Sequence, residues 1–279
     1  MPATPQKAGE YSTMVRGFTV PRSPLGLTAI TPPPPWHYSG DVIGVEYWFD
    51  PAATAAFLPE GLSPDPESNG HAFFLFVDWQ FTATNEEYLD PARYQYREAF
   101  ILIDAHWGDL PVAFCPLIYV DNDAALARGW IQGFPKRLGS VAQTRTFAAT
   151  GPATAPVAAG GKFGASLSAH GVRLAEAYVT LECRVEDSGA IFNRPTALMR
   201  YFPRIEKERS SEPAVNDLTL LLTDNLQIVD LWIGEAELDI FTARGEEIHR
   251  LAPVKVGSGF RYGLAYSVTD LRVLQDFTA

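Results

Sequence analysis

A single lysine lies inside an apolar segment punctuated by glycines, GWIQGFPKRLGS, at residues 129–140. Lys136 has large apolar neighbours on both sides, and the chain's other four lysines lack comparable surroundings. Withdrawal from water lowers the pKa of an amine, and the neutral amine is a nucleophile toward carbonyl carbon. The alternative is an ordinary lysine whose stem packs on aromatic surface while its ammonium group reaches water.

Other sequence signatures of catalytic or cofactor sites are missing. The five histidines are scattered, and the chain has no HExxH, P-loop, GxSxG or GxGxxG pattern. The two cysteines, Cys115 and Cys183, form no CxxC pair, so we expect both to be small buried hydrophobic residues. The sequence therefore predicts no metal site and no cofactor.

The spacing of apolar residues predicts a fold made mainly of strands. Residues 173–183 alternate apolar and polar side chains, which is typical of antiparallel strands that are wetted on one face and does not suit a βαβ fold. Short helices are expected at residues 50–61, capped by Asp50, and at residues 121–129, with an aspartate cap and an end at Gly129. The uncharged segment 146–161 is expected to be a long loop.

Net charge excludes one class of partner. The charge of -11 and the sequence pI near 4.9 predict a surface that repels phosphate backbones, so we expect no nucleic acid partner. The longest apolar run, AFFLFV at residues 72–77, is too short to cross a bilayer, and the first thirty residues do not resemble a signal peptide. We therefore expect a cytoplasmic protein with no membrane partner.

Several segments resemble the acetoacetate decarboxylase family. GFPKRLG is similar to the family's active-site segment, in which a lysine is followed by a second cation. RSPLG near residue 22, FNRPTALMRYFP and LWIGEAELDIFTARGEEIHRLAPVKV resemble further family segments in the same order. The resemblance implies an α+β, mainly β fold, with a large antiparallel sheet closed into a barrel or cone and a few short helices. We expect an N-terminal arm at residues 1–20 and one catalytic domain at residues 21–279.

The same resemblance implies roles for three ionisable side chains. Lys136 would form a Schiff base with a substrate ketone, and Arg137 would disfavour its ammonium form electrostatically. Adjacent residues on a strand point to opposite faces, so we expect burial to supply at least half of the effect on the lysine pKa. Glu98, in YREAFIL, would handle protons, although a solvated glutamate or a partner for Arg97 is an equal alternative.

Four further residues are candidates for substrate binding. Gln132, four positions before the lysine, could hydrogen-bond a substrate oxygen or stabilise a turn. Trp130 and Phe134 supply apolar surface beside it. Tyr262 lies in the C-terminal segment that approaches the pocket in the family, and Tyr266 shares its strand parity, so the sequence does not choose between them.

The sequence also departs from the decarboxylase pattern. PPPPWHYSGD has no arginine or lysine where the family carries a carboxylate-binding arginine, and no second glutamate is evident near residues 71–81. Two lyase reactions therefore stay open: decarboxylation of a β-keto acid, and aldol condensation of pyruvate followed by dehydration. A noncatalytic β-barrel that binds a small apolar carboxylic acid or ketone is the alternative from another class. The resemblance also implies a small keto acid substrate and a homo-oligomer.

Overall fold

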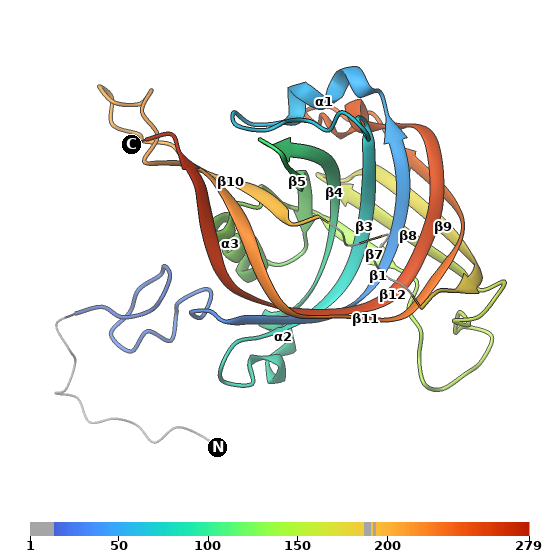
Figure 1. The fold of residues 1–279 in the computed structure, drawn as a ribbon. Coiled ribbons are helices and arrows are strands. Elements are labelled where there is room, and N and C mark those ends of the chain that lie inside the picture. Colours follow the sequence, from blue (N-terminus) through green and yellow to red (C-terminus); the bar gives the residue numbers. More distant parts are fainter. Residues whose placement is uncertain (1–13, 187–190, 192–193, 279) are drawn as a thin grey trace, which may run out of the picture.

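The fold is organised around one 12-stranded sheet with few helices, as expected. The computed structural model describes residues 14–186, 191 and 194–278 (Figure 1). Its strands are β1 (Trp36–Phe49), β2 (Ser63–Pro64), β3 (His71–Thr82), β4 (Gln95–Trp107), β5 (Leu110–Val120), β6 (Lys136–Leu138), β7 (Ser140–Gln143), β8 (Lys162–Ala169), β9 (Val172–Arg184), β10 (Thr196–Phe202), β11 (Val215–Ile240) and β12 (Pro253–Asp276). The helices are α1 (Pro51–Phe57), α2 (Pro91–Tyr94), α3 (Asp123–Gln132) and the 3₁₀ turns η1 (Glu87–Leu89) and η2 (Ile248–Leu251).

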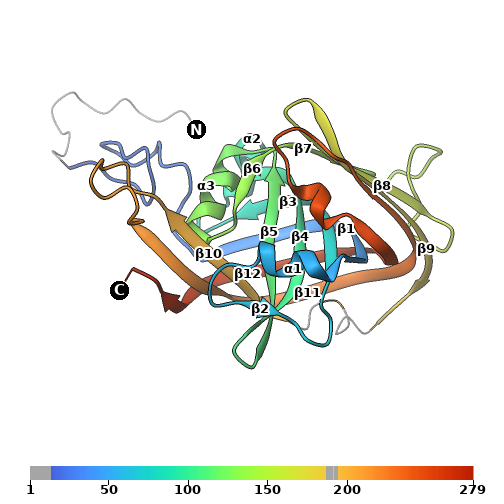
Figure 2. The same ribbon diagram turned by 90° about the horizontal axis from the view of Figure 1, so that it is seen from above.

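Part of this sheet closes into a ring. The strand order is β10-β5-β4-β3-β1-β12-β11-β9-β8-β7, and β10 pairs with β11 as well as with β5. The strands from β10 through β11 in this order therefore form a closed circuit, and β9, β8 and β7 continue from it as an extension. Figures 1 and 2 show the long, curved β11 and β12; β11 also pairs with β9 and so joins the ring to the extension.

The sheet is mixed rather than wholly antiparallel. β10 and β6 each pair with β5 in parallel, whereas the remaining pairings are antiparallel. A parallel pair needs a crossover connection, and α3 supplies it between β5 and β6. The fold as a whole is not a βαβ fold, as expected, but β5, α3 and β6 form one local βαβ unit, and this unit carries Lys136.

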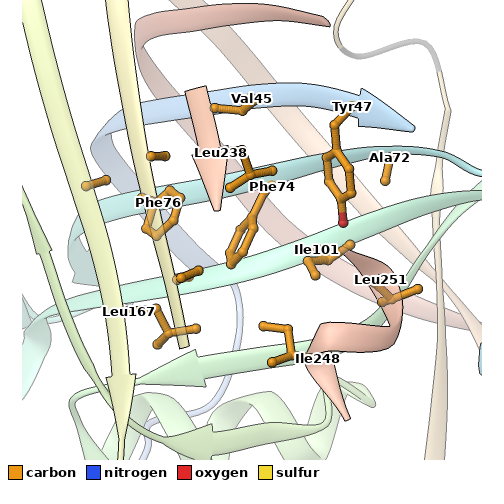
Figure 3. Close-up of a cluster of buried hydrophobic side chains, with 14 of the residues drawn as sticks. Val45, Tyr47, Ala72, Phe74, Phe76, Ile101, Leu167, Leu238, Ile248 and Leu251 are labelled. Atoms are coloured by element: carbon orange, nitrogen blue, oxygen red, sulfur yellow. The ribbon is translucent and has the colours of Figure 1, made fainter. Parts of the chain in front are cut away.

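Both faces of the sheet are buried over much of its area. On β3, Phe74 and Phe76 pack into the core between the ring and the β7–β9 extension, shown in Figure 3, while Leu75, Val77 and Trp79 face the interior of the ring. Successive residues of a strand alternate between faces, so a strand buried on both sides is apolar without interruption. This explains the continuous run AFFLFV.

The local predictions have mixed outcomes. Helix α1 begins after Asp50, whose carboxylate accepts a hydrogen bond from the backbone N–H of Ala52, as expected. Helix α3 is capped by Asn122 instead of an aspartate, and it runs through Gly129 to end at Gly133, which adopts a left-handed φ of 105°. The segment between β7 and β8 is the expected loop, with no strand from residue 144 to 161.

The two cysteines differ in burial. Cys115 is buried, as predicted, but Cys183 is exposed. The β9–β11 register shifts between the pairs Ile233–Cys183 and Gly234–Leu181, which leaves an extra residue on β9. Such a bulge changes the alternation of inward and outward side chains at the end of the strand.

The residues before β1 form little regular structure. From residue 14 to residue 35 the backbone makes one isolated bridge, between Arg16 and Ser23. Most of the expected N-terminal arm, residues 1–13, lies outside the described residues, and the domain boundary stays a prediction. Within the described part of the chain, no helix is both long and apolar enough to cross a membrane.

The core between the ring and the extension gives a stability prediction. Phe76 is fully buried, and its ring stacks on Phe74 with centroids 4.6 Å apart. We expect Phe76→Ala to lower the free energy of unfolding by about 3–5 kcal/mol, measured by urea denaturation, because it removes an aromatic ring and leaves a cavity. Phe147→Ala, in an exposed loop, is the control, and an equal loss there would contradict this account.

Candidate active site

The β5–α3–β6 unit determines where Lys136 points. Gly133 ends α3 in a left-handed conformation, and the chain then turns back to lie beside β5, where Lys136 pairs with Ile118. Ile118 belongs to the core inside the ring, and side chains of paired residues lie on the same face of a sheet. The Lys136 side chain is 7% exposed, so the structure buries it on the inner side of the ring.

Glu98 is the partner of this lysine. Its Oε2 lies 2.7 Å from Nζ of Lys136, and its Oε1 accepts a hydrogen bond of 2.7 Å from the indole Nε1 of Trp79. Glu98 is on β4 and is also buried. Both carboxylate oxygens are thus held in place, one by the amine and one by a rigid ring on the neighbouring strand β3. The alternative of a solvent-exposed glutamate does not fit this position.

Burial is the largest influence on the Lys136 amine. It lowers the pKa of Lys136, because the ammonium form loses its hydration, and the positive charge of Arg128 lowers it further. The Glu98 carboxylate acts in the opposite direction, and the net pKa is below the ordinary value for lysine. The site therefore favours the neutral amine more than water does.

Arg128, on α3, is the cation that the sequence analysis missed. It is 1% exposed, its Nε donates a 3.0 Å hydrogen bond to the hydroxyl of Tyr38, and its guanidinium lies 3.8 Å from the ring centre of Phe81. Neither of its Nη nitrogens hydrogen-bonds to a described residue. Gln132, one helical turn later, is also buried and reaches the Tyr38 hydroxyl at 3.4 Å. The sequence carried a signal for this pair, because an arginine and a glutamine four positions apart lie on the same face of an otherwise apolar helix.

Arg137 lies on the other side of β6. Its Nη1 is 2.6 Å from Oε2 of Glu246, the carboxylate that also accepts a 2.6 Å hydrogen bond from the hydroxyl of Tyr119. Consecutive strand residues point to opposite faces, so the guanidinium is directed away from the amine. The expected electrostatic role of Arg137 thus passes to Arg128, and the arginine–glutamate pair instead ties β6 to the segment before η2.

Three of the other candidates are placed as follows. Phe134 lies with its ring centre 5.8 Å from Nζ of Lys136 and lines a cavity of about 320 Å³ inside the ring. Tyr262 and Tyr266 both line this cavity, so the two side chains lie on the same face of β12, as their spacing predicts. Trp130 is 49% exposed outside the cavity, and its indole N–H donates to the backbone oxygen of Lys136 at 2.8 Å. Trp130 therefore stabilises the lysine's backbone and does not contact the cavity.

Comparison with known proteins identifies the family of this chain. The family model of acetoacetate decarboxylase (ADC) matches residues 19–277. The chain belongs to this family. A search of curated proteins found no match. Among solved structures, the enduracididine biosynthesis enzyme MppR, complexed with the condensation product of pyruvate and imidazole 4-carboxaldehyde, is 34% identical, with a TM-score of 0.88 over 95% of this chain and 99% of that chain.

Two further solved structures share the fold. MppR complexed with pyruvate is likewise 34% identical, with a TM-score of 0.87 over 95% of this chain and 100% of that one. An acetoacetate decarboxylase-like enzyme from Sphingomonas wittichii RW1 is 24% identical, with a TM-score of 0.85 over 94% of this chain and 100% of that one. Family membership and these enzyme relatives support an enzyme with lyase character.

Gly129 provides the space for the lysine side chain. A Cβ atom added there would lie 2.6 Å from Cγ and 2.7 Å from Cε of Lys136. Gly129→Ala removes an unfavourable helix residue, which by itself favours the helix by about 1 kcal/mol, but it must displace the lysine. We expect kcat to fall about 10²-fold through misplacement of the amine, with the melting temperature nearly unchanged.

The matched control is Gly164→Ala, where the nearest atoms belong to the Tyr178 side chain at 3.3 Å. This variant should keep its activity. Steady-state assays and thermal denaturation of both variants test the idea. Full activity in Gly129→Ala would show that the lysine does not need this space.

Arg128 and Arg137 are expected to differ in their effect on the pKa of Lys136. Arg128→Met removes a nearby positive charge, so the pKa of Lys136 should rise and its acylation by acetic anhydride should begin at higher pH. Arg137→Met should leave this titration in place. Peptide mass spectrometry at a series of pH values measures the labelling, with the chain's other lysines as internal references. A shift in Arg137→Met alone would reverse the assignment.

Proposed function

We propose that this protein is an aldolase-dehydratase that joins pyruvate to an aldehyde through a Schiff base on Lys136. The observation that carries the proposal is a buried amine that contacts one carboxylate, Glu98, beside a buried arginine with two unused donors. The relatives at 34% identity that are complexed with pyruvate and with a pyruvate condensation product support it.

Arg128 is suited to bind the carboxylate of the keto acid. Its two Nη nitrogens form a planar fork that matches both oxygens of a carboxylate, and burial strengthens such charge-assisted hydrogen bonds. Gln132 lies on the same face of α3 and offers an amide to the same substrate. In this arrangement the carboxylate sits toward α3 while the keto carbon faces Lys136.

Glu98 is positioned to move the proton. The neutral amine of Lys136 attacks the keto carbon, water leaves, and the resulting iminium acidifies the adjacent methyl group. Glu98 Oε2, already 2.7 Å from Nζ, takes a methyl proton and leaves an enamine. Trp79 holds the other carboxylate oxygen, which fixes the direction of the base. The enamine carbon is then the nucleophile for an aldehyde.

Decarboxylation of a β-keto acid starts from the same iminium and is the second candidate. A guanidinium that pairs with the substrate carboxylate stabilises it relative to CO₂, which favours a reaction that retains the carboxylate. The decarboxylase members at 18% and 16% identity share the fold alone. Release of CO₂ from acetoacetate, without product from pyruvate and an aldehyde, would favour this second reaction.

Borohydride reduction tests the covalent step directly. We expect incubation with pyruvate and borohydride to inactivate the enzyme and to add the reduced adduct to the peptide that contains Lys136, detected by mass spectrometry. Lys136→Arg, which keeps the positive charge, should remain unlabelled. No adduct, or an adduct on a different lysine, would leave the noncatalytic binding module as the better account.

Glu98→Gln separates the proton step from Schiff base formation. Exchange of the pyruvate methyl protons in D₂O, followed by NMR, should slow by about 10²- to 10⁴-fold because the base is lost. The Glu98 carboxylate raises the pKa of Lys136 against the effect of burial, so its removal should lower that pKa and move Schiff base trapping to lower pH. An unchanged exchange rate would assign the base elsewhere.

A further inference from the structure

The cavity inside the ring extends away from Trp79 and Phe134, the two lining residues that lie beside the Glu98–Lys136 pair. On β3, Trp79, Val77 and Leu75 all line it, and on β4 the same face carries Glu98, followed by the lining residues Phe100 and Leu102. Four residues of a strand span about 13 Å. In the proposed function, pyruvate would occupy only the inner end of such a length, beside Lys136 and α3. The outer part is free for a second reactant.

The wall of this outer part is apolar and contributed by several strands. It is formed by Val42, Leu75, Phe100, Leu102, Leu221 and Leu264. Apart from Arg194, the polar lining groups are neutral, with hydroxyls at Thr196 and Thr223 and on the two tyrosines of β12. Such a surface gains free energy by burying an apolar body and cannot compensate a charge for its lost hydration.

One lining side chain is charged, and its charge is already balanced. Among the described residues that line the cavity, only Arg194 carries a formal charge, and its Nη1 lies 2.5 Å from Asp65. Its Nη2 donates to Ser68 at 3.2 Å and lies 3.4 Å from Asp104. Although burial raises the pKa of Asp65, the Arg194 hydrogen bond and two backbone N–H groups bring it down to about 2. Asp65 is thus a permanent anion, and Arg194 has no charge to spare for a second carboxylate.

We propose that the aldehyde used by this enzyme is neutral and apolar, with an aromatic ring as the best-fitting body. This inference rests on the proposed function and specifies its second substrate. The aldehyde carbon lies at Lys136, and the ring extends between β3, β4 and β11 toward Leu102. Aldehydes with a distal carboxylate are excluded by the apolar wall and the neutralised Arg194.

The reaction balances without a further reactant. The enamine carbon of pyruvate bonds to the aldehyde carbon, and the carbonyl π electrons move to oxygen, which takes a proton. A second proton leaves the same pyruvate carbon and the hydroxyl leaves as water, which gives a conjugated iminium. Hydrolysis of that iminium frees Lys136 and releases an unsaturated α-keto acid. The net change is pyruvate plus aldehyde to this acid plus one water.

An aldehyde series tests the inference on the unmodified enzyme. With saturating pyruvate, we expect kcat/KM for benzaldehyde to exceed that for 4-carboxybenzaldehyde and for acetaldehyde at least about 10-fold, followed by absorbance of the conjugated product. A preference for 4-carboxybenzaldehyde, or equal values for acetaldehyde and benzaldehyde, would overturn it. Deuterium exchange into pyruvate without aldehyde separates this inference from the proposed function. If exchange occurs but the enzyme has no preference for benzaldehyde, only this inference fails. If no exchange occurs, the proposed function fails with it.

A charge placed on the outer wall provides an independent test. Leu102→Arg adds an unpaired cation near the predicted ring position and should move the ratio of kcat/KM values toward 4-carboxybenzaldehyde by at least about 10-fold. Leu89→Arg, at a leucine that is 71% exposed in η1 and does not line the cavity, adds the same charge elsewhere and should leave the ratio unchanged. Equal shifts in both variants would contradict a local role for the wall.

Discussion

Removal of one ammonium group from water is the constraint on which the site depends. Transfer of an ion into a protein interior costs several kcal/mol, and Lys136 meets this cost in two ways, by pairing with Glu98 and by a lowered pKa. The pair alone would favour the charged amine. Burial and Arg128 oppose it, so the balance among these three groups sets how much nucleophilic amine exists at neutral pH.

A local exception in the sheet creates this balance. Most of the sheet is antiparallel, but β5, α3 and β6 form a parallel unit whose helix packs against the core inside the ring. The helix brings Arg128 and Gln132 to the same side as the lysine that follows it. Gly129, inside the helix, leaves space for the lysine stem, which explains why a residue unfavourable to helices occupies that position.

The other cations near the site are neutralised by carboxylates. Arg137 is paired with Glu246, and Arg194 with Asp65. Charges that are matched in this way hold segments together and exert little field at a distance. Among the buried arginines and lysines of the described chain, Arg128 differs because its Nη nitrogens are unpaired, which leaves one position inside the ring where an anion is favoured.

The sequence alone determined the family, the mainly β fold and the unusual lysine, because these depend on local composition and short-range pattern. An apolar setting around Lys136 and the alternation along β9 are visible without any contact information. Only the tertiary structure decided which groups meet the lysine. Glu98 lies on β4, 38 residues before the lysine, and Arg128 lies on α3, the helix that precedes β6. The physical reason is visible in the two arginines. Arg137 follows Lys136 on a strand and therefore points to the opposite face, whereas the crossover helix brings the side chain of Arg128 to the same side as the lysine.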